Sequence, residues 1–186
     1  MQLKLLRRNT MYQGKVFNVI VDDVEYPSGN KSIREVAEHP GGAVVLGVFP
    51  DERIILIRQH RYPFDDFIWE LPAGRLGPGE DPFKCAKREL EEETGYYGTE
   101  WNKITSIYTT PGFCSEVLHI YMARNLTNAP DGRKLEEGEA TMTMKIVPLS
   151  EAIAMIERGE IRDGKTICGI LLGERLLQEG RTSGRE

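Results

Sequence analysis

Residues 88–93, Arg-Glu-Leu-Glu-Glu-Glu, place four carboxylates within five positions. On a helix, with about 100° between residues, Glu89, Glu92 and Glu93 share one face while Glu91 points nearly opposite. Carboxylates at this spacing repel one another, which costs roughly several tenths of a kcal/mol per pair on an exposed helix. A hard divalent cation with oxygen ligands, such as Mg²⁺ or Mn²⁺, would offset that repulsion. The spacing therefore predicts a metal site.

The alternative interpretation is a solvated acidic face, with Arg88 paired to Glu92 one turn later. The residues upstream favour the metal site, because they extend the group into a fixed pattern. The pattern runs Gly74, five residues, Glu80, seven residues, Arg88-Glu89-Leu90, one residue, Glu92-Glu93, one residue and Gly95. Without Leu90, the pattern has seven fixed residues, and a match at all seven is expected by chance on the order of once per million sequences, given ordinary amino-acid usage.

The helix that must hold these carboxylates has clear end signals. Asp81 is a good N-cap, Pro82 suits the first helical position, and Gly95 stands where a C-terminal glycine belongs. Phe83 and Leu90 belong to an apolar stripe at helical spacing. A helix between residues 81 and 95 is therefore predicted.

Strand signals surround this helix. Residues 2–40 show alternating side chains and a turn at Pro27-Ser28-Gly29-Asn30, which predicts antiparallel strands. Further strands are predicted at 43–48, 53–59, 67–71, 104–110, 117–123 and 141–147, with helices from 150 and over 166–179. This order predicts an α+β or α/β sandwich.

Composition narrows the class of protein. The chain has 186 residues, a net charge of −5 and 40% hydrophobic residues, which suits one globular domain with a real core. The acidic balance argues against a nucleic-acid partner. Cys85, Cys114 and Cys168 form no CxxC pair, and no apolar run approaches the ~18 residues of a membrane span. We therefore expect a cytoplasmic protein with reduced thiols and no membrane partner.

The spaced pattern resembles the signature of the Nudix hydrolase family at every fixed position, with Tyr96 replacing the usual aliphatic residue at its end. The resemblance spans roughly Ala43 to Ser150. It implies the Nudix fold, a mixed sheet sandwiched between helices. The implied organisation is an N-terminal strand extension over 1–40, which contacts substrate or a second subunit, a hydrolase domain over 41–180, and a disordered tail over 181–186.

The resemblance also implies roles within the pattern. Glu89, Glu92 and Glu93 would bind the metal, joined by the Ala73 carbonyl and more loosely by Glu80. Arg88 would orient the carboxylates, and Glu93 is also expected to be catalytic. The metal would make a nucleophile of water and stabilise charge on the leaving phosphate.

Segments outside the pattern resemble the ADP-ribose pyrophosphatase branch of the family. They are 34–36 with 38–42, the RQxR-like 58–62, the segment 69–74 and the segment 160–166. Pro111 lies sixteen residues after Gly95, a spacing associated with ADP-sugar enzymes. The branch implies ADP-ribose as substrate, AMP and ribose 5-phosphate as products, and a homodimer.

The branch also implies substrate-binding residues. Arginine's forked donors suit phosphate, so Arg34 and Arg61 would clamp the diphosphate; the alternative is a pair of surface charges. Tyr12 and Phe17 would stack on the base, although an aromatic residue in a hairpin is more often part of a core. The remaining expected substrate contacts are Glu70, Pro111 and Glu116.

A general base is expected on the loop before the strand that ends at Pro148. Glu136, Glu137 and Glu139 are the candidates; we favour Glu139 and place Glu137 second. The alternative is a flexible acidic loop without a catalytic role.

Other functions remain open at this point. GDP-mannose or several nucleotide sugars could replace ADP-ribose. A Nudix-fold sensor that binds without hydrolysis would be expected to lose the pattern's carboxylates and to gain a DNA-binding domain. A protein whose acidic helix is purely structural and binds no ligand would not explain why the pattern is complete.

Overall fold

The computed structural model describes residues 2–183, with side chains described up to Glu179. The chain forms two compact units. The first contains the residues up to Gly41 together with Tyr108–Val117, and the second contains Gly42–Ile107 and the residues from Leu118 onward. Residues 108–117, which the sequence placed in the hydrolase domain, therefore belong to the first unit.

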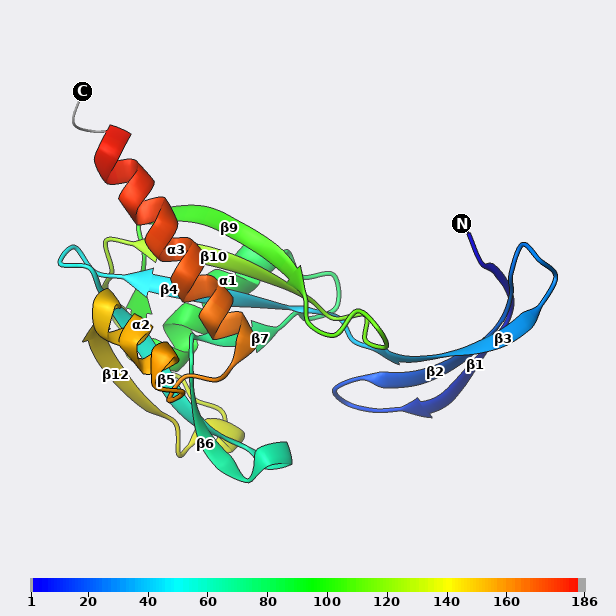
Figure 1. Ribbon diagram of the computed structural model, residues 1–186. Coiled ribbons are helices and arrows are strands. Elements are labelled where there is room, and N and C mark those ends of the chain that lie inside the picture. Colours follow the sequence, from blue (N-terminus) through cyan, green and yellow to red (C-terminus); the bar gives the residue numbers. More distant parts are fainter. Residues whose placement is uncertain (1, 184–186) are drawn as a thin grey trace. The chain divides into compact units, whose positions relative to one another are not determined.

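The first unit is a three-stranded antiparallel sheet in the order β1 (Lys4–Gln13), β2 (Asn18–Glu25), β3 (Lys31–Glu38) (Figure 1). The β2–β3 hairpin closes at the predicted turn, where Gly29 has φ of 84° and Tyr26 N–H donates to the Asn30 carbonyl. The segment 108–117 pairs with the end of β3, since Ala37 N–H donates to the Phe113 carbonyl at 2.7 Å.

The second unit is built on a mixed seven-stranded sheet. Its strands are β4 (Gly42–Val48), β5 (Arg53–Arg61), β6 (Asp66–Glu70), β7 (Ala73–Arg75), β9 (Glu100–Tyr108), β10 (Val117–Arg124) and β12 (Thr143–Pro148). The main order is β12-β5-β4-β10-β9, with β6 paired to β5 and β7 to β4. The pair β4 and β10 is parallel, whereas β5 runs antiparallel to β4 and β12. The short strands β8 (Tyr96–Tyr97) and β11 (Thr127–Asn128) form a separate pair.

In the described part of the chain, three α-helices cover this sheet: α1 (Pro82–Thr94), α2 (Leu149–Glu157) and α3 (Gly164–Ser183). Two single-turn 3-10 helices, η1 (Tyr62–Phe64) and η2 (Glu137–Glu139), lie in loops.

Strand β4 explains why helices cover both faces of the sheet. All its residues are buried, and alternate side chains enter different cores. Ala43 and Val45 pack in a cluster with Leu90 of α1. Val44 and Leu46 pack in a second cluster, which contains Met155 of α2 and Ile170 of α3. A continuous apolar strand buried on both faces is typical of a sheet between two helical layers. The predicted sandwich is confirmed (Figure 1).

Helix α1 begins and ends where the sequence indicates. Asp81 accepts hydrogen bonds from the backbone N–H groups of Phe83 and Lys84, both at 3.1 Å. Gly95 ends the helix with φ of 73°, a left-handed conformation that costs little only for glycine. Tyr96, just beyond, packs edge-on against Phe49 with ring centroids 5.2 Å apart.

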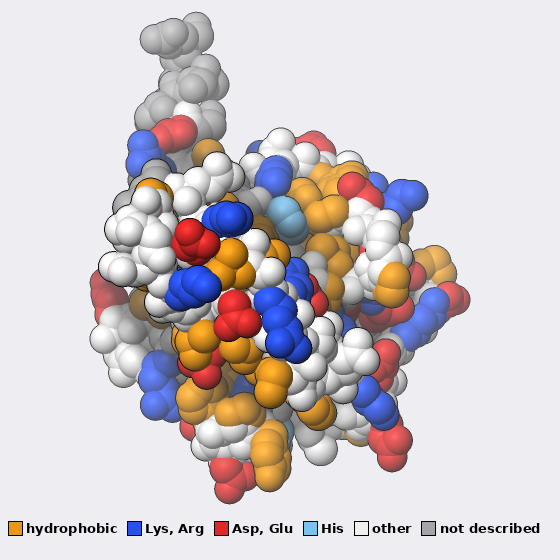
Figure 2. Space-filling model, turned by 90° about the vertical axis from the view of Figure 1, so that its right-hand side faces the viewer, with side chains coloured by type: hydrophobic (Ala, Val, Ile, Leu, Met, Phe, Trp, Pro, Cys, Tyr) orange, Lys and Arg blue, Asp and Glu red, His pale blue; other side chains and the backbone are white. Residues whose placement is uncertain are grey.

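The other elements differ from prediction mainly at their ends. Strands β1, β7, β8 and β11 were not individually predicted, because short or exposed strands carry little alternation of burial. The backbone of α3 extends to Ser183, and residues 184–186 of the predicted tail lie outside the described residues. No helix in the described part of the chain is long and apolar enough to cross a membrane. On the face drawn in Figure 2, acidic and basic side chains are interspersed with hydrophobic ones.

Because the Asp81 carboxylate caps two N–H groups of α1, we expect Asp81→Ala to lower the free energy of unfolding by about 1 kcal/mol. Asp81→Asn keeps a capping oxygen and is the matched control. Urea unfolding of the three proteins tests this; equal midpoints for Asp81→Ala and the unchanged protein would contradict it.

Candidate active site

The carboxylates of α1 are not a solvated face. Glu93 is 1% exposed and Glu89 is 8% exposed, while Glu92 is half-buried. Moving a carboxylate out of water is costly unless a partner compensates it. The burial therefore argues against the interpretation of α1 as a simple acidic surface.

Arg88 connects three of the acidic side chains. Its guanidinium donates to Glu80 Oε1 at 3.0 Å and Oε2 at 3.1 Å, to Glu89 Oε1 at 2.6 Å and to Glu92 Oε2 at 3.0 Å. The Arg88–Glu92 pair anticipated for a solvated face is thus present, but as one contact of a larger network. The orienting role expected of Arg88 stays a prediction.

Glu93 lies on the inner side of this group. Its Oε2 accepts a hydrogen bond from Ala73 N–H at 2.9 Å, so β7 and α1 are joined through the carboxylate. Burial raises the pKa of Glu93 well above its usual range, against the lowering effect of that N–H, and the charges of Glu89, Glu139 and Glu70 raise it further. Burial also raises the pKa of Glu89, although Arg88 opposes the shift.

Gly74, the first residue of the spaced pattern, is required by this packing. A Cβ atom built on Gly74 would overlap the carboxylate of Glu89. The glycine therefore makes room for an acidic side chain against the backbone of β7.

The residues present fit a hard divalent cation. The donors are carboxylate oxygens from one helical turn, the set that Mg²⁺ and Mn²⁺ prefer. Among the described residues no cation lies in ion-pair contact with the Glu93 carboxylate, which has the Ala73 N–H as its donor and the charge of Arg61 at longer range. Among the described side chains, no three acidic, histidine or cysteine residues are already arranged to hold a metal ion, and Glu89 and Glu92 are paired with Arg88.

The candidate bases lie on the loop that contains η2. Glu139 Oε2 accepts from Glu136 N–H at 3.0 Å and closes a capping box with that residue. Glu139 is half-buried, and its charge is one cause of the raised pKa values of Glu89 and Glu93. Glu136 and Glu137 are exposed. Glu139 as the base, with Glu137 second, stays a prediction.

Arg61 and Glu70 form a second polar centre. Arg61 Nε and Nη2 donate to the two Glu70 oxygens at 2.7 and 2.6 Å, and Lys165 Nζ donates to Glu70 Oε2 at 2.5 Å. Lys165 also pairs with Asp163 at 2.9 Å. Burial alone would raise the pKa of the Glu70 carboxyl, but Arg61 and Lys165 outweigh it and lower that pKa. Two donors of Arg61 are thus engaged by protein.

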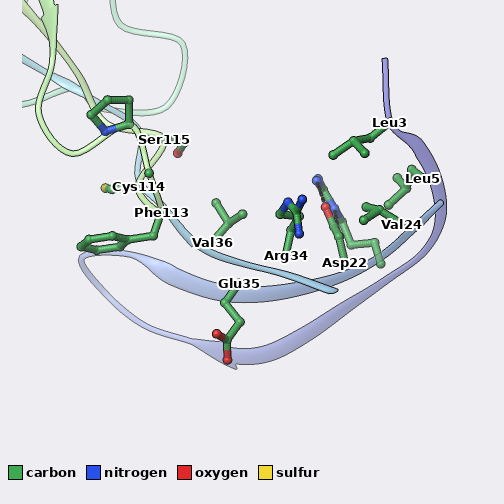
Figure 3. A pocket seen from close by; sticks show the side chains of 13 residues that line it. Leu3, Leu5, Asp22, Val24, Arg34, Glu35, Val36, Phe113, Cys114 and Ser115 are labelled. Carbon is green, nitrogen blue, oxygen red and sulfur yellow. Dashed lines mark hydrogen bonds and ion pairs between the residues drawn. The ribbon is translucent and has the colours of Figure 1, made fainter. Parts of the chain in front are cut away.

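The remaining predicted residues lie in the first unit. Arg34 and Pro111 line a pocket of about 520 Å³ over the three-stranded sheet. In Figure 3 Arg34 and Val36 point to the same side of β3 as Asp22 of β2, whereas Glu35 points away. Arg34 also donates to the Tyr26 hydroxyl at 2.5 Å and to the Ile33 carbonyl at 2.7 Å.

The other three residues predicted to bind substrate also belong to this unit. Tyr12 and Phe17 are exposed, with 59% and 43% of their surface accessible. Glu116 is half-buried, with Oε1 3.3 Å from His39 Nδ1. An exposed aromatic side chain is free to stack on a base, so the core alternative is not what the structure shows for Tyr12 or Phe17.

The structure thus groups the predicted residues in three places. Ala73, Glu80, Arg88 and the three α1 carboxylates form the first group, with the loop of Glu137 and Glu139 nearby. Arg61 lies on Glu70, and the five other predicted residues lie in the first unit. Sequence reasoning did not assign roles to Lys165, Asp163 and Arg133. The charged segment 160–166 was a signal for the first two, whereas nothing in the local sequence marks Arg133.

Comparison with known proteins shows the family to which the chain belongs. Residues 38–169 match the model of the NUDIX domain. The chain is 41% identical to the ADP-ribose pyrophosphatase of Bacillus subtilis (strain 168), over 90% of either chain. It is 37% identical to the methanol dehydrogenase activator of Bacillus methanolicus, again over 90% of either chain.

More distant relatives include a GDP-mannose pyrophosphatase of Yersinia enterocolitica, 32% identical over 88% of either chain. A solved structure, described as an ADP compounds hydrolase, superposes with a TM-score of 0.82. It covers 97% of this chain and 96% of its own at 20% identity, which shows the fold. The chain belongs to the Nudix family, as the spaced pattern predicted, and is a Nudix hydrolase.

Because Glu70 is buried and balances two cations, we expect Glu70→Gln to cost about 3 kcal/mol of unfolding free energy near pH 7. The pKa of Glu70 is lowered in the folded protein, so its stabilisation is present above the unfolded pKa and is lost as pH falls through the folded pKa. The difference between the two proteins should therefore shrink in acid.

Asp51→Asn is the control, because it removes an exposed ion pair with Arg53 that solvent screens, and it should change the stability far less than Glu70→Gln does. Denaturant unfolding at several pH values measures both effects. A Glu70→Gln protein as stable as the Asp51→Asn protein would contradict the prediction.

Proposed function

We propose that this hydrolase cleaves ADP-ribose to AMP and ribose 5-phosphate with a divalent cation, Mg²⁺ or alternatively Mn²⁺. The observation that carries the proposal is the burial of Glu89 and Glu93 on α1, within a complete family pattern. Relatives named ADP-ribose pyrophosphatase at 41% and 36% identity support the choice of substrate.

The residues proposed to hold the cation are Glu89, Glu92 and Glu93, with the Ala73 carbonyl and Glu80 as further contacts. When bound, the cation would neutralise the diphosphate and lower the pKa of an attacking water. Arg88 would then keep the carboxylates in place, because its network already links Glu80, Glu89 and Glu92.

Glu139 is proposed as the base, and Glu137 as the second choice. Water would attack one phosphorus of the diphosphate, the bridging P–O bond would break, and the carboxylate of Glu139 would accept the proton from water. Only Oε2 of Glu139 accepts from Glu136 N–H, so Oε1 would be the oxygen that takes the proton.

Substrate contacts are proposed from the other groups. Arg61 would bind a phosphate through the donors that Glu70 does not use. The contact between Glu70 and Lys165 would hold the Glu70 side chain, and with it Arg61, in place. Arg34, with Pro111 and Glu116, would contact the nucleotide, and Tyr12 or Phe17 would stack on the base. A homodimer and a cytoplasmic location remain predictions.

A second candidate substrate is GDP-mannose, which the name of the Yersinia relative favours. The two substrates share the diphosphate chemistry and differ in the base and sugar, so the α1 carboxylates do not distinguish them. A binding sensor without hydrolysis is disfavoured, since all the carboxylates of the pattern are present.

A substrate panel tests the proposed activity. We expect purified protein with Mg²⁺ to convert ADP-ribose to AMP and ribose 5-phosphate, and to lose activity in a chelator. Chromatographic product analysis with ADP-ribose, GDP-mannose and other nucleotide sugars measures the order of kcat/KM. Equal or better turnover of GDP-mannose would reject ADP-ribose as the preferred substrate.

Removal of one carboxylate tests the metal site. We expect Glu93→Gln to reduce kcat by at least ~10²-fold, because a neutral amide loses metal-centred stabilisation of charge. Glu91→Gln, on the opposite face of the same helix, is the matched control and should keep near-normal kcat. Steady-state assays decide; a Glu93→Gln enzyme as active as the control would remove Glu93 from the site.

A further inference from the structure

Arg133 lies at the C-terminal end of α1, although it is forty residues away from Glu93 in the chain. Its Nε donates to the Glu93 backbone carbonyl at 2.6 Å. The last carbonyls of a helix have no partner within the helix, and a cation there also interacts favourably with the helix dipole. Arg133 therefore supplies a charged donor at the turn of α1 that carries the carboxylates.

The backbone around Arg133 docks on the same helix end. Lys134 N–H donates to the Glu92 carbonyl at 2.8 Å, and Ala129 N–H donates to the Gly95 carbonyl at 2.7 Å. A turn between these two contacts brings Arg133 back to the helix, with Gly132 N–H donating to the Ala129 carbonyl. Proline at 130 and glycine at 132 suit the positions they occupy in such a turn.

The other end of the Arg133 guanidinium reaches the loop of the candidate base. Nη1 and Nη2 both lie 3.4 Å from the Met142 carbonyl oxygen. Met142 is buried, and its N–H donates to the Glu139 carbonyl at 2.7 Å. A continuous chain of contacts thus runs from Glu93 through Arg133 and Met142 to Glu139.

We propose that Arg133 is a positioning residue, which fastens the turn bearing Glu139 to the helix end bearing Glu92 and Glu93. The inference rests on the proposed function, because it assigns Glu139 as base. Arginine suits the task since its planar fork bonds two acceptors in a fixed geometry, whereas lysine presents a single charged point. Arg133 itself touches neither substrate nor water in this role.

The experiment compares Arg133→Ala, Arg133→Lys and the control Arg158→Ala in the full-length enzyme with Mg²⁺ and ADP-ribose. Arg158, at the end of α2, likewise bonds two acceptors, but these are the carboxylates of Glu151 and Glu160. We expect Arg133→Ala to lower kcat roughly 10- to 100-fold, because a misplaced catalytic group is costly, with KM within about twofold. Arg133→Lys should recover part of kcat, and Arg158→Ala should keep normal kinetics.

Amide hydrogen exchange without metal or substrate supplies an independent measurement. Arg133→Ala should speed exchange in residues 136–142 and leave α2 and α3 unchanged. Unfolding curves give the folded fraction, and kcat is expressed per folded molecule. The proposal is overturned if corrected kcat is unchanged, if only KM rises, if lysine recovers nothing, or if exchange in 136–142 does not change.

The two hypotheses fail in different ways. If the enzyme without substitutions leaves ADP-ribose intact, the proposed substrate is wrong. The exchange measurement would then still decide whether Arg133 holds the turn. An active enzyme that ignores the loss of Arg133 would reject only the positioning role.

Discussion

The structure depends on the burial of like-charged carboxylates on one turn of α1. Glu89 and Glu93 are removed from water at the end of a helix whose dipole disfavours negative charge. The protein compensates with Arg88 on one side and with backbone N–H and arginine contacts on the other. In the proposed function a bound cation would supply the remaining compensation, so that stability and catalysis would depend on the same residues.

The fold holds that turn in place by enclosing α1 against the sheet. The odd-numbered side chains of β4 pack on α1, and the even-numbered ones pack in the core below α2 and α3. The carboxylate of Glu93 reaches β7, and Gly74 leaves room for that of Glu89. The apolar core therefore fixes the positions of groups that would otherwise repel one another.

Arginine has different tasks at different places in this chain. Arg88 balances the carboxylates, Arg61 balances the buried Glu70, and Arg133 connects the helix end to a loop. Each uses the fork of the guanidinium to bond more than one acceptor. Such pairing costs desolvation free energy, which the protein recovers only when every charge is matched. Removal of one partner of such a pair should therefore disturb the geometry around the other partner more than the change in net charge alone suggests.

The sequence by itself determined helix α1, its caps, the family and the sandwich, because end signals and the alternation of burial are local properties. It also identified the carboxylates, since a spacing of three and four residues places them on one helical face. Only the tertiary structure decided that Glu93 is buried, that Lys165 meets Glu70 and that Arg133 meets Glu93. Those contacts join residues 40 or 95 positions apart, and no local pattern records them because packing alone brings them together.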